Sequence, residues 1–447
     1  MIHAVYEMIF FGPTTYVVAF CSLLLIFLVK FTIARRHYYK RRHGLIPKYP
    51  HKEYTVTSLV TYAGEEASFF EQALRSLRTL TGLKTHKIYS LMDGMGDITP
   101  NDEASLRAAE KYATRIWLGN YKKKRFNLWF MTSEAEAAGD DAEIMHLMDS
   151  DTFFPKTDVG YLMTQPFADP KMGGGTTAQR AHLRTTSAMR TGDLLEHARI
   201  GLSLAASNET RGIPCLPGRS IWLRWLAAAK HMLGLNSEYW GMWVPSWNTN
   251  FPFIFKWIRV ECYAGDDRYL TDRIHFDKWD SFFNPDAGVE TLLGGTRSKM
   301  YKQWWRWCTT SQGNTYRNAR SLWRNKPFAL LYHLSDTYSA FVAAFLMWSW
   351  LFSVLFGNGE VFWPLSMILA SSFVSMSSML IAKNYVYFKK YPKDLLSVPL
   401  FLLDIAVGVH IRIFANFTQW RVKTWGTRSG VDDKTEIKFV REHHWKH

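Results

Sequence analysis

The chain has 447 residues, of which 47% are hydrophobic, and it carries a formal net charge of +15. A mean hydropathy of −0.16 excludes a protein that lies wholly inside lipid, but the length leaves room for one large domain and a few membrane helices. The positive charge requires an anionic partner, such as a membrane surface or a phosphate-bearing substrate, and no nucleic-acid-binding motif is present.

The first predicted element is an apolar helix near the N-terminus. Residues 14–33 form an apolar stretch close to the ~20 residues that a bilayer requires. A basic run follows at once, and the positive-inside rule places it in the cytosol; it comprises Arg35, Arg36, His37, Lys40, Arg41, Arg42 and His43. We therefore expect an uncleaved transmembrane helix within residues 1–34, an outside N-terminus, and lipid head groups as the partner of the basic run.

Residues 35–300 are predicted to form a cytosolic α/β domain. Short apolar runs that end in turn-like residues indicate strands, at 55–62, 87–94, 114–119 and 143–151. Helical stretches lie between and beside them, at 66–80, 102–113 and 123–137. This alternation favours a mostly parallel sheet with helices on both faces. Ligands of such sheets bind beyond the carboxyl ends of the strands, where Asp93, Asp149 and Asp151 stand.

The sequence Asp149-Ser150-Asp151 is a candidate metal site. Two carboxylates after a strand can converge on a hard cation and a diphosphate, and Mn²⁺ and Mg²⁺ both favour oxygen ligands. Acidic loops of this kind also arise by chance, so the motif alone leaves both readings open. The four cysteines, which are far apart and lack metal spacing, indicate neither zinc nor a disulfide framework; they are Cys21, Cys215, Cys262 and Cys308.

A second acidic motif, Gly265-Asp266-Asp267-Arg268, follows the apolar run that ends at residue 264. When a hydroxyl group attacks a sugar, a carboxylate within hydrogen-bond reach can take up its proton. The alternative is an acidic surface turn in which Arg268 merely pairs with the carboxylates.

Large aromatic residues and cations are concentrated in Gln303-Trp304-Trp305-Arg306-Trp307. Arginine binds diphosphates through its two-pronged guanidinium group, and tryptophan faces pack on sugar C–H surfaces. An interfacial membrane anchor is the alternative. Lys122, Lys123, Lys124 and Arg125 form a further basic cluster that suits a nucleotide diphosphate or a solvated helix start.

The C-terminal third is predicted to combine interfacial and membrane segments. Residues 301–326 read as an interfacial helix, as do residues about 219–234 and 384–396, because tryptophan or tyrosine alternates there with basic residues. Core helices with the same aromatic residues are the alternative. Within 327–420, the apolar stretches 328–356 and 361–383 should span the membrane. The third stretch, 398–418, contains Asp404, His410 and Arg412, so we expect it to be re-entrant or interfacial, which leaves the tail 421–447 in the cytosol.

Three motifs in this order, DSDT, GDDRYLT and QWWRW, resemble those of family 2 glycosyltransferases that make hyaluronan, chitin-like and cellulose-like polymers. The resemblance is closest to hyaluronan synthases and their relatives, which include fungal type 2 glycosyltransferases. It extends to KKKR at 122–125, CLPGRSIWLR at 215–224 and WGTR at 425–428, so it covers residues 52 to 430. It implies a GT-A-type α/β domain joined to interfacial helices and transmembrane segments.

The resemblance also implies roles for individual residues. Asp267 is expected to be the general base, with Asp266 as the fallback, and Asp151 and Asp149 to bind Mn²⁺ or Mg²⁺. The residues expected to contact the donor, its diphosphate or the acceptor sugar are Glu65, Asp93, Lys124, Arg125, Asp149, Cys215, Gly218, Arg268, Gln303, Arg306 and Trp307. Trp425 and Arg428 are expected to cover the nucleotide.

Two departures from the family pattern concern the substrates. The P-x-YNE segment of the family appears as TYAGEE at 61–66, where Glu65 is the best match and Tyr62 is the one candidate ring for stacking on uracil. In the acceptor segment, Pro217-Gly218-Arg219 stands where hyaluronan synthases have Ser-Gly-Pro.

The expected function is that of a plasma-membrane, multi-pass, processive and inverting glycosyltransferase with a cytosolic catalytic domain. It would use a UDP-sugar donor and a growing polysaccharide acceptor, with no nucleic acid, and secrete the polymer through its own channel. One alternative is a transferase that moves a single sugar onto a lipid phosphate. The other is a nucleotide-binding transporter, which the charged residues of 398–418 leave open.

Overall fold

The computed structural model describes residues 13–46, 49–62, 64–94, 98–119, 124–236, 241–248, 251–261, 265–355, 384–418 and 438–442, and a few single positions between 363 and 381. Of 241–261 and 438–442 it describes the backbone alone.

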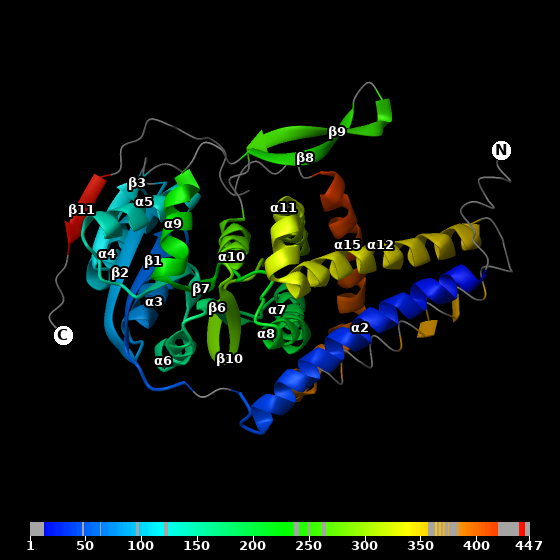
Figure 1. The fold of residues 1–447 in the computed structure, drawn as a ribbon, viewed down its shortest axis with the longest axis horizontal. Helices are drawn as coiled ribbons and strands as arrows, with labels where there is room; N and C mark the ends of the chain where they lie inside the picture. The colour runs from blue at the N-terminus through cyan, green and yellow to red at the C-terminus, as the bar shows by residue number, and fades with distance from the viewer. Residues whose placement is uncertain are drawn as a thin grey trace.

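One large sheet is the centre of the α/β domain (Figure 1). Its described strands follow the order β11-β3-β2-β1-β4-β7-β6-β10-β5. Their bounds are β1 (Tyr54–Tyr62), β2 (Leu83–Asp93), β3 (Arg115–Gly119), β4 (Ile144–Asp149), β5 (Thr152–Phe153), β6 (Met172–Ala181), β7 (Ser220–Arg224), β10 (Asp280–Thr291) and β11 (Lys438–Glu442). The expected α/β architecture and its first four strands are therefore confirmed.

The sheet is mixed rather than mostly parallel. Strands β1, β2, β3 and β4 are mutually parallel, and β6 is parallel to β10. Strand β7 runs antiparallel between β4 and β6, and the edge strands β11 and β5 are also antiparallel to their neighbours. Sequence alternation predicts strand–helix–strand units but contains no sign of β7, because this short strand is buried on both faces and looks like the start of a helix.

Helices bury the sheet on both sides. On one face, α3 (Ala67–Arg78), α4 (Pro100–Tyr112) and α6 (Val159–Thr164) pack on side chains such as Val56 and Val60. On the other face, α5 (Lys124–Ala137), α9 (Trp225–Leu233) and α10 (Asp266–Phe276) pack on side chains such as Leu59 and Leu147. The period-2 alternation of strand side chains explains why neighbouring residues of β1 enter different cores.

Helix α9 differs from the expected interfacial helix at about 219–234. Ser220–Arg224 is strand β7, whose Trp222 is fully buried, and the helix begins only at Trp225. Ala227, Ala228 and Met232 of α9 belong to the core on the sheet. In Figure 1 this helix covers the left part of the domain, away from α2 and α12, so it is a core helix rather than a membrane-surface helix.

The remaining described elements lie outside the large sheet and the helices that cover it. They are α7 (Ser187–Arg199), the π-helical turn η2 (Ile200–Leu204), α8 (Ala205–Glu209), the 3₁₀ turns η1 (Gln165–Ala168), η3 (Gly234–Asn236) and η4 (Pro392–Ser397), the hairpin β8 (Gly241–Asn248) and β9 (Phe251–Glu261), and the helices α2 (Pro13–Arg42), α11 (Arg297–Asn325), α12 (Pro327–Leu355), α14 (Tyr385–Lys390) and α15 (Val398–Phe417).

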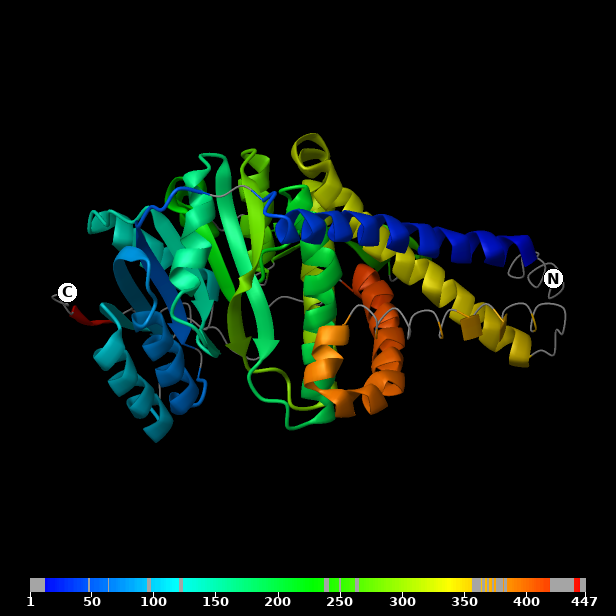
Figure 2. The same cartoon turned by 90° about the horizontal axis from the view of Figure 1, so that it is seen from below.

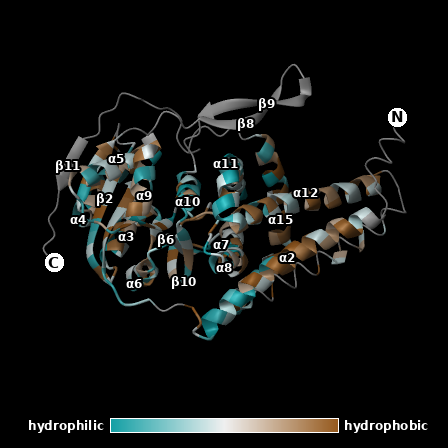
Figure 3. Cartoon of the chain, viewed as in Figure 1, coloured by the Kyte–Doolittle hydropathy of each residue, from teal (hydrophilic) through white to brown (hydrophobic). Residues whose placement is uncertain are grey.

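Three described segments are long and apolar enough to cross a membrane, namely Thr15–Arg42, Pro327–Leu355 and Pro392–Phe417. Figure 3 shows brown, hydrophobic residues along the helices that contain them. They are not arranged alike, however. In both Figure 1 and Figure 2, α2 and α12 extend away from the domain to the right, whereas α15 runs across that direction beside α11.

The charged residues of the apolar segments are bonded to other parts of the protein. Asp336 of α12 lies 2.6 Å from Lys30 Nζ and 3.4 Å from Arg412 Nη1, so it connects α2, α12 and α15. Asp404 is fully buried and contacts Arg297 Nε at 3.2 Å. Buried charges in lipid are tolerated when they pair in this way.

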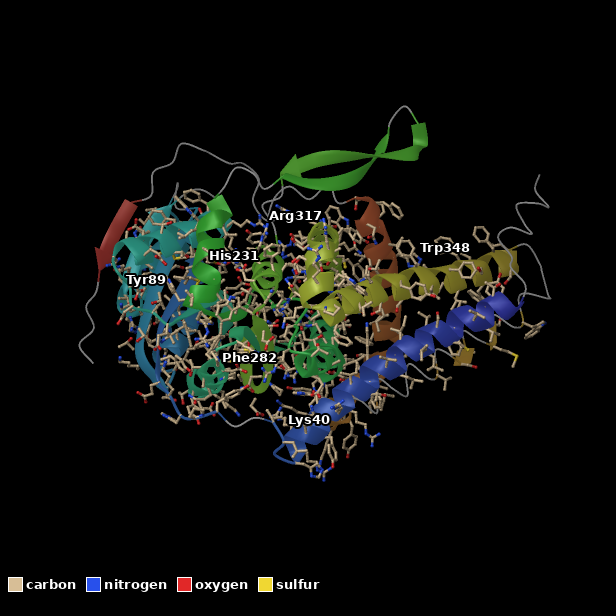
Figure 4. All side chains as sticks on the ribbon, in the orientation of Figure 1. Lys40, Tyr89, His231, Phe282, Arg317 and Trp348 are labelled. Carbon is tan, nitrogen blue, oxygen red and sulfur yellow. The ribbon has the colours of Figure 1, made fainter. Side chains whose placement is uncertain are left out.

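The basic end of α2 docks onto the α/β domain. Arg36 and Lys40 both pair with Glu209 at the end of α8, and Arg41 pairs with Asp286 of β10. Figure 4 shows Lys40 at the end of α2 that lies beneath the domain, and Trp348 far along α12. Part of the basic run therefore contacts carboxylates of the protein, while Arg35, Arg42 and His43 are exposed, and the expectation that lipid head groups bind the run stays a prediction.

Candidate active site

Acidic residues gather at one edge of the sheet. Strands β1, β2 and β4 are parallel neighbours, so Glu65, Asp93 and Asp149 all follow the same ends of these strands. Across the β4–β7 pair, the Asp149 amide donates to the Arg219 carbonyl at 3.4 Å. The edge at which the sequence predicts a site is thus built by parallel strand pairing.

Lys124, the first residue of α5, joins the two acidic motifs. Its ammonium nitrogen lies 2.5 Å from Asp149 Oδ1 and 3.6 Å from Asp266 Oδ2. Burial alone would lower the pKa of Lys124, but Asp149 and Asp266 outweigh this effect, and the pKa is raised. The lysine therefore stays charged between the DSD and GDD motifs.

Asp267 lies at the N-terminus of α10, beside Asp266. Gly265 precedes the helix at a φ of 78°, and a Cβ atom there would lie 3.0 Å from Thr310 Cβ, so a glycine is required. Asp267 Oδ1 accepts the backbone N–H of Arg268 at 2.7 Å. Burial raises the pKa of Asp267, and Asp266 raises it further. A carboxylate with a raised pKa is a better proton acceptor than an ordinary aspartate.

Cys215 and Gly218 border the same carboxylate. The Cys215 thiol lies 3.8 Å from Asp267 Oδ2, and burial raises the pKa of this thiol, with Asp267 adding to the effect. A Cβ atom on Gly218 would lie 3.5 Å from Lys124 Nζ and 3.8 Å from Asp267 Oδ2. Both residues are therefore next to the group that we expect to accept a proton.

Asp151 is a buried carboxylate that lies close to other acids. Burial raises its pKa to about 7, with Asp149 and Glu65 as further causes. Its side chain accepts from Thr291 Oγ1 at 3.5 Å. Oxygen donors with excess negative charge fit a divalent cation. Among the residues that the structure describes, no three acidic, histidine or cysteine side chains form a complete metal cage, so phosphate oxygens would have to complete the coordination.

Helix α11 brings the aromatic motif to these carboxylates. Burial lowers the pKa of Arg306, and the nearby Asp149, Asp267 and Asp266 oppose that shift. Trp307 is 39% exposed, and its ring centroid lies 5.5 Å from the Arg219 guanidinium carbon. Gln303, one turn earlier, is half-buried. The site thus combines acids, cations and an accessible indole.

Arg268 does not line the site, which corrects its expected role in substrate binding. Its side chain is 2% exposed, pairs with Asp272 at 3.2 Å, and donates to Thr315 Oγ1 at 3.0 Å and to the Pro214 carbonyl. These contacts use the guanidinium group to hold α10 against α11. Arg268 is therefore a structural residue.

Three further expected residues are buried in the protein. Tyr62 is fully buried in the core and donates to Asp102 Oδ1 at 2.9 Å, so its ring offers no face to uracil. Asp93 is 2% exposed and accepts from Asn127 Nδ2 at 2.8 Å. Arg125 is buried near the ring of Tyr269. Trp425 and Arg428, together with Lys122 and Lys123, lie outside the described residues.

A buried polar network beside Asp149 is not predicted from the sequence. Arg219 Nη1 donates to Gln179 Oε1 at 3.0 Å and to Glu196 Oε1 at 2.9 Å. The sequence marks Arg219 as unusual, because it stands where hyaluronan synthases have proline. No sequence pattern marks Gln179 and Glu196, because they come from β6 and α7 and contact Arg219 only in the folded chain.

Comparison with known proteins supports a glycosyltransferase. No family model matches the chain. A type 2 glycosyltransferase of Pyricularia oryzae is 22% identical over 440 residues, which cover 94% of this chain and 83% of that protein. This similarity extends over nearly the whole chain and supports a glycosyltransferase of the type 2 kind.

Solved structures with a similar arrangement are more distant. The mannosyltransferase PcManGT of Pyrobaculum calidifontis, solved with GDP-Man and Mn²⁺, is 13% identical, with coverage of 89% of this chain and 99% of that one and a TM-score of 0.48. Glucosyl-3-phosphoglycerate synthase of Mycobacterium tuberculosis, solved with Mn²⁺, UDP and its product, is 12% identical, with 60% and 80% coverage and a TM-score of 0.36.

Proposed function

We propose that this protein is a membrane-embedded, inverting glycosyltransferase that extends a polysaccharide from a UDP-sugar donor, like hyaluronan synthases. One observation carries the proposal: Lys124 joins Asp149 of the first acidic motif to Asp266 of the second, next to Asp267. Residues far apart in the sequence thus form one acidic group with a buried cation. Such a group suits a metal-bound diphosphate beside a general base.

In the proposed reaction, Asp267 takes the proton from the acceptor hydroxyl as the oxygen attacks the anomeric carbon from the face opposite the diphosphate. Asp151 and Asp149 would hold Mn²⁺ or Mg²⁺, which would polarise the leaving diphosphate when bound. Lys124 and Arg306 place positive charge near the same group, where they offset the charge that develops on the departing UDP.

The acceptor is proposed to lie against α11. Trp307 exposes an indole face for a sugar ring, and Gln303 stands one turn away on the same helix. Trp304 of α11 lies against Gly408 of α15, where a Cβ atom would be 3.4 Å from its ring, so an acceptor on α11 is close to the apolar segments. We infer from this that the polymer is extended by repeated additions and leaves through a channel between these segments.

The proposed topology places α2, α12 and the apolar stretch 361–383, most of which lies outside the described residues, across the plasma membrane and the catalytic domain in the cytosol. The transverse direction of α15, although the helix is apolar enough to span, supports an interfacial or re-entrant position beside α11. The polar contacts of α15 agree, because Asp404 bonds to Arg297 and Tyr301 of α11.

The transporter alternative loses its main support. This alternative depends on the charged residues within 398–418, and in the described structure each of them contacts protein. Asp404 pairs with Arg297, Arg412 pairs with Asp336, and His410 Nδ1 lies 2.8 Å from the Ala406 carbonyl. Asp404 and Arg412 thus connect helices rather than line an aqueous path, whereas His410 bonds within its own helix and lines a cavity with Trp348 and Leu351 of α12.

The proposal is tested with purified protein in lipid nanodiscs, Mn²⁺ and radiolabelled UDP-sugars, given singly and in pairs. We expect release of UDP and a long product that a polymer-specific hydrolase degrades. A product limited to one added sugar on a lipid would instead favour the lipid-phosphate transferase. If no UDP-sugar releases UDP while a GDP-sugar releases GDP, the donor assignment is wrong.

A further inference from the structure

Arg219 stands directly across the sheet from the first acidic motif. It immediately precedes β7, and its carbonyl accepts the Asp149 amide at 3.4 Å. Its guanidinium carbon lies 5.5 Å from the centroid of the Trp307 ring. Arg219 is therefore between the residues that we assign to the donor diphosphate and the residue that we assign to the acceptor.

The side chain of Arg219 is fixed by its neighbours. It is 7% exposed, and Nη1 donates to both Gln179 and Glu196. Arg199 binds the same two partners, at 2.7 Å from Glu196 Oε2 and 3.3 Å from Gln179 Oε1. The guanidinium group is thus held in one orientation by residues from β6 and α7.

Two buried donors in this network have no acceptor in the described part of the chain. They are Nη2 of Arg219 and Nε2 of Gln179, and each belongs to a group whose other end is hydrogen-bonded. Buried donors without a partner are rare in folded proteins and require an explanation. Because both atoms can only donate, the missing partner is an acceptor oxygen.

The charges of the network favour an anionic partner. Arg199 and Arg219 carry two positive charges, and Glu196 carries one negative charge, so these three side chains leave an excess of one positive charge. Arg219 also opposes the rise in the pKa of Asp151, so an ionised Asp151 offsets part of this excess. An anionic oxygen at the two free donors would form charge-assisted hydrogen bonds, which are stronger than bonds to water.

We propose that Arg219 and Gln179 form a binding site for an anionic oxygen group of the substrate. Two sources share this chemistry: a phosphoryl oxygen of the nucleotide-sugar donor, and the carboxylate of an acidic sugar at the acceptor end. The proposal rests on the proposed function and specifies what its site recognises. It also gives a reason for arginine at a position where hyaluronan synthases have proline.

Two variants separate this role from a structural one. Arg219→Met removes the fork but keeps an unbranched side chain, and Glu196 keeps its pair with Arg199. Gln179→Glu keeps the acceptors for Arg199 and Arg219, but it removes the Nε2 donor and adds a negative charge. Arg107→Gln is the matched control, because it removes one cation at a 68% exposed side chain on α4. Thermal unfolding of each variant in nanodiscs monitors folding.

Dissociation constants are measured by calorimetry with Mn²⁺ for UDP, UMP and inorganic pyrophosphate, and for oligosaccharides that end in glucuronate or in glucose. Losing a hydrogen bond to a charged group should weaken binding by about 10- to 100-fold. If the source is phosphate, both variants weaken UDP and pyrophosphate but affect UMP much less. If it is the saccharide, they weaken the glucuronate-ended oligosaccharide alone.

Unchanged affinity for all five probes, relative to Arg107→Gln, would overturn the proposal and mean that the two donors bind water only. Failure of the proposed function looks different, because the wild-type protein would then neither bind UDP nor release it from a UDP-sugar. In that case the pyrophosphate measurement still decides whether Arg219 and Gln179 bind an anion.

Discussion

The ammonium group of Lys124 lies 2.5 Å from Oδ1 of Asp149, and this contact brings the start of α5 to the end of β4. The lysine side chain is 8% exposed, so the pair is shielded from water. Because Asp266 is also near the ammonium group, at 3.6 Å, Lys124 compensates two carboxylates that would otherwise repel each other.

Removal of this cation should destabilise the domain. We expect Lys124→Met to lower the free energy of unfolding by about 3 kcal/mol, since buried carboxylates lose their counter-charge. Lys52→Met is the matched control: Lys52 also pairs with a carboxylate, that of Glu143, but both side chains are exposed (52% and 41%), so its loss should cost less than about 1 kcal/mol. Urea unfolding of both variants measures the difference, and equal losses would contradict a buried charge-compensating role.

The general-base assignment predicts a selective loss of turnover. Asp267→Asn should lower kcat by about 10²- to 10⁴-fold, because the amide cannot accept the acceptor's proton. The dissociation constant of UDP should change little. Asp141→Asn, at a 73% exposed side chain, is the control and should retain full activity. Near-normal turnover of Asp267→Asn would remove this aspartate from the mechanism.

The pH dependence of transfer should identify which of the two adjacent aspartates is the base. Burial and then Asp266 raise the pKa of Asp267, and a base must be deprotonated, so transfer should slow as pH falls through this raised pKa. Asp266→Asn removes one of the causes, so the acidic limb of kcat/KM should move to lower pH while activity persists. Complete loss of activity in Asp266→Asn, with activity retained in Asp267→Asn, would reverse the assignment.

Local sequence patterns predict the parts of the fold that depend on local physics. The apolar run correctly predicts strand β4, and Asp149 is correctly predicted as its polar end. The parallel pairing of β1 and β4 then places the acids on one edge, as expected from alternating strands and helices. Asp149 and Asp266 come together through tertiary packing. In the sequence, this proximity is indicated by the order of the motifs that resemble the family.

Packing between distant parts of the chain explains where the predictions from sequence are wrong. Ser220–Arg224 looks like a helix start, but it becomes a strand because β4 and β6 provide partners on both sides. Arg268 looks like a substrate ligand in its motif, but Asp272, one turn later, and Thr315 of α11 bind its guanidinium group. Gln179 is unremarkable in sequence, because its hydrogen-bond partners lie 20 and 40 residues away.

Asp336 should be more important for stability than either of the cations it contacts. Asp336→Asn leaves the positive charges of Lys30 and Arg412 near each other without the carboxylate between them. Lys30→Met, in contrast, leaves the pair of Arg412 and Asp336 intact. We expect the midpoint of thermal unfolding in nanodiscs to fall by several degrees for Asp336→Asn and clearly less for Lys30→Met. The opposite order would mean that Asp336 does not connect the three helices.

The transverse position of α15 predicts that both of its ends face the cytosol. Its direction differs from that of α2 and α12, and Tyr316 and Gln312 of α11 bond to Asn416 and to the Arg412 carbonyl along its length. Two single cysteines are introduced into a cysteine-free background: Lys393→Cys, and a cysteine added after His447. Both should react with a membrane-impermeant maleimide in inside-out vesicles, and neither should react in right-side-out cells. Labelling of position 393 from inside and of the C-terminus from outside would show instead that α15 spans the bilayer, since an apolar helix of this length reaches across it when it stands upright.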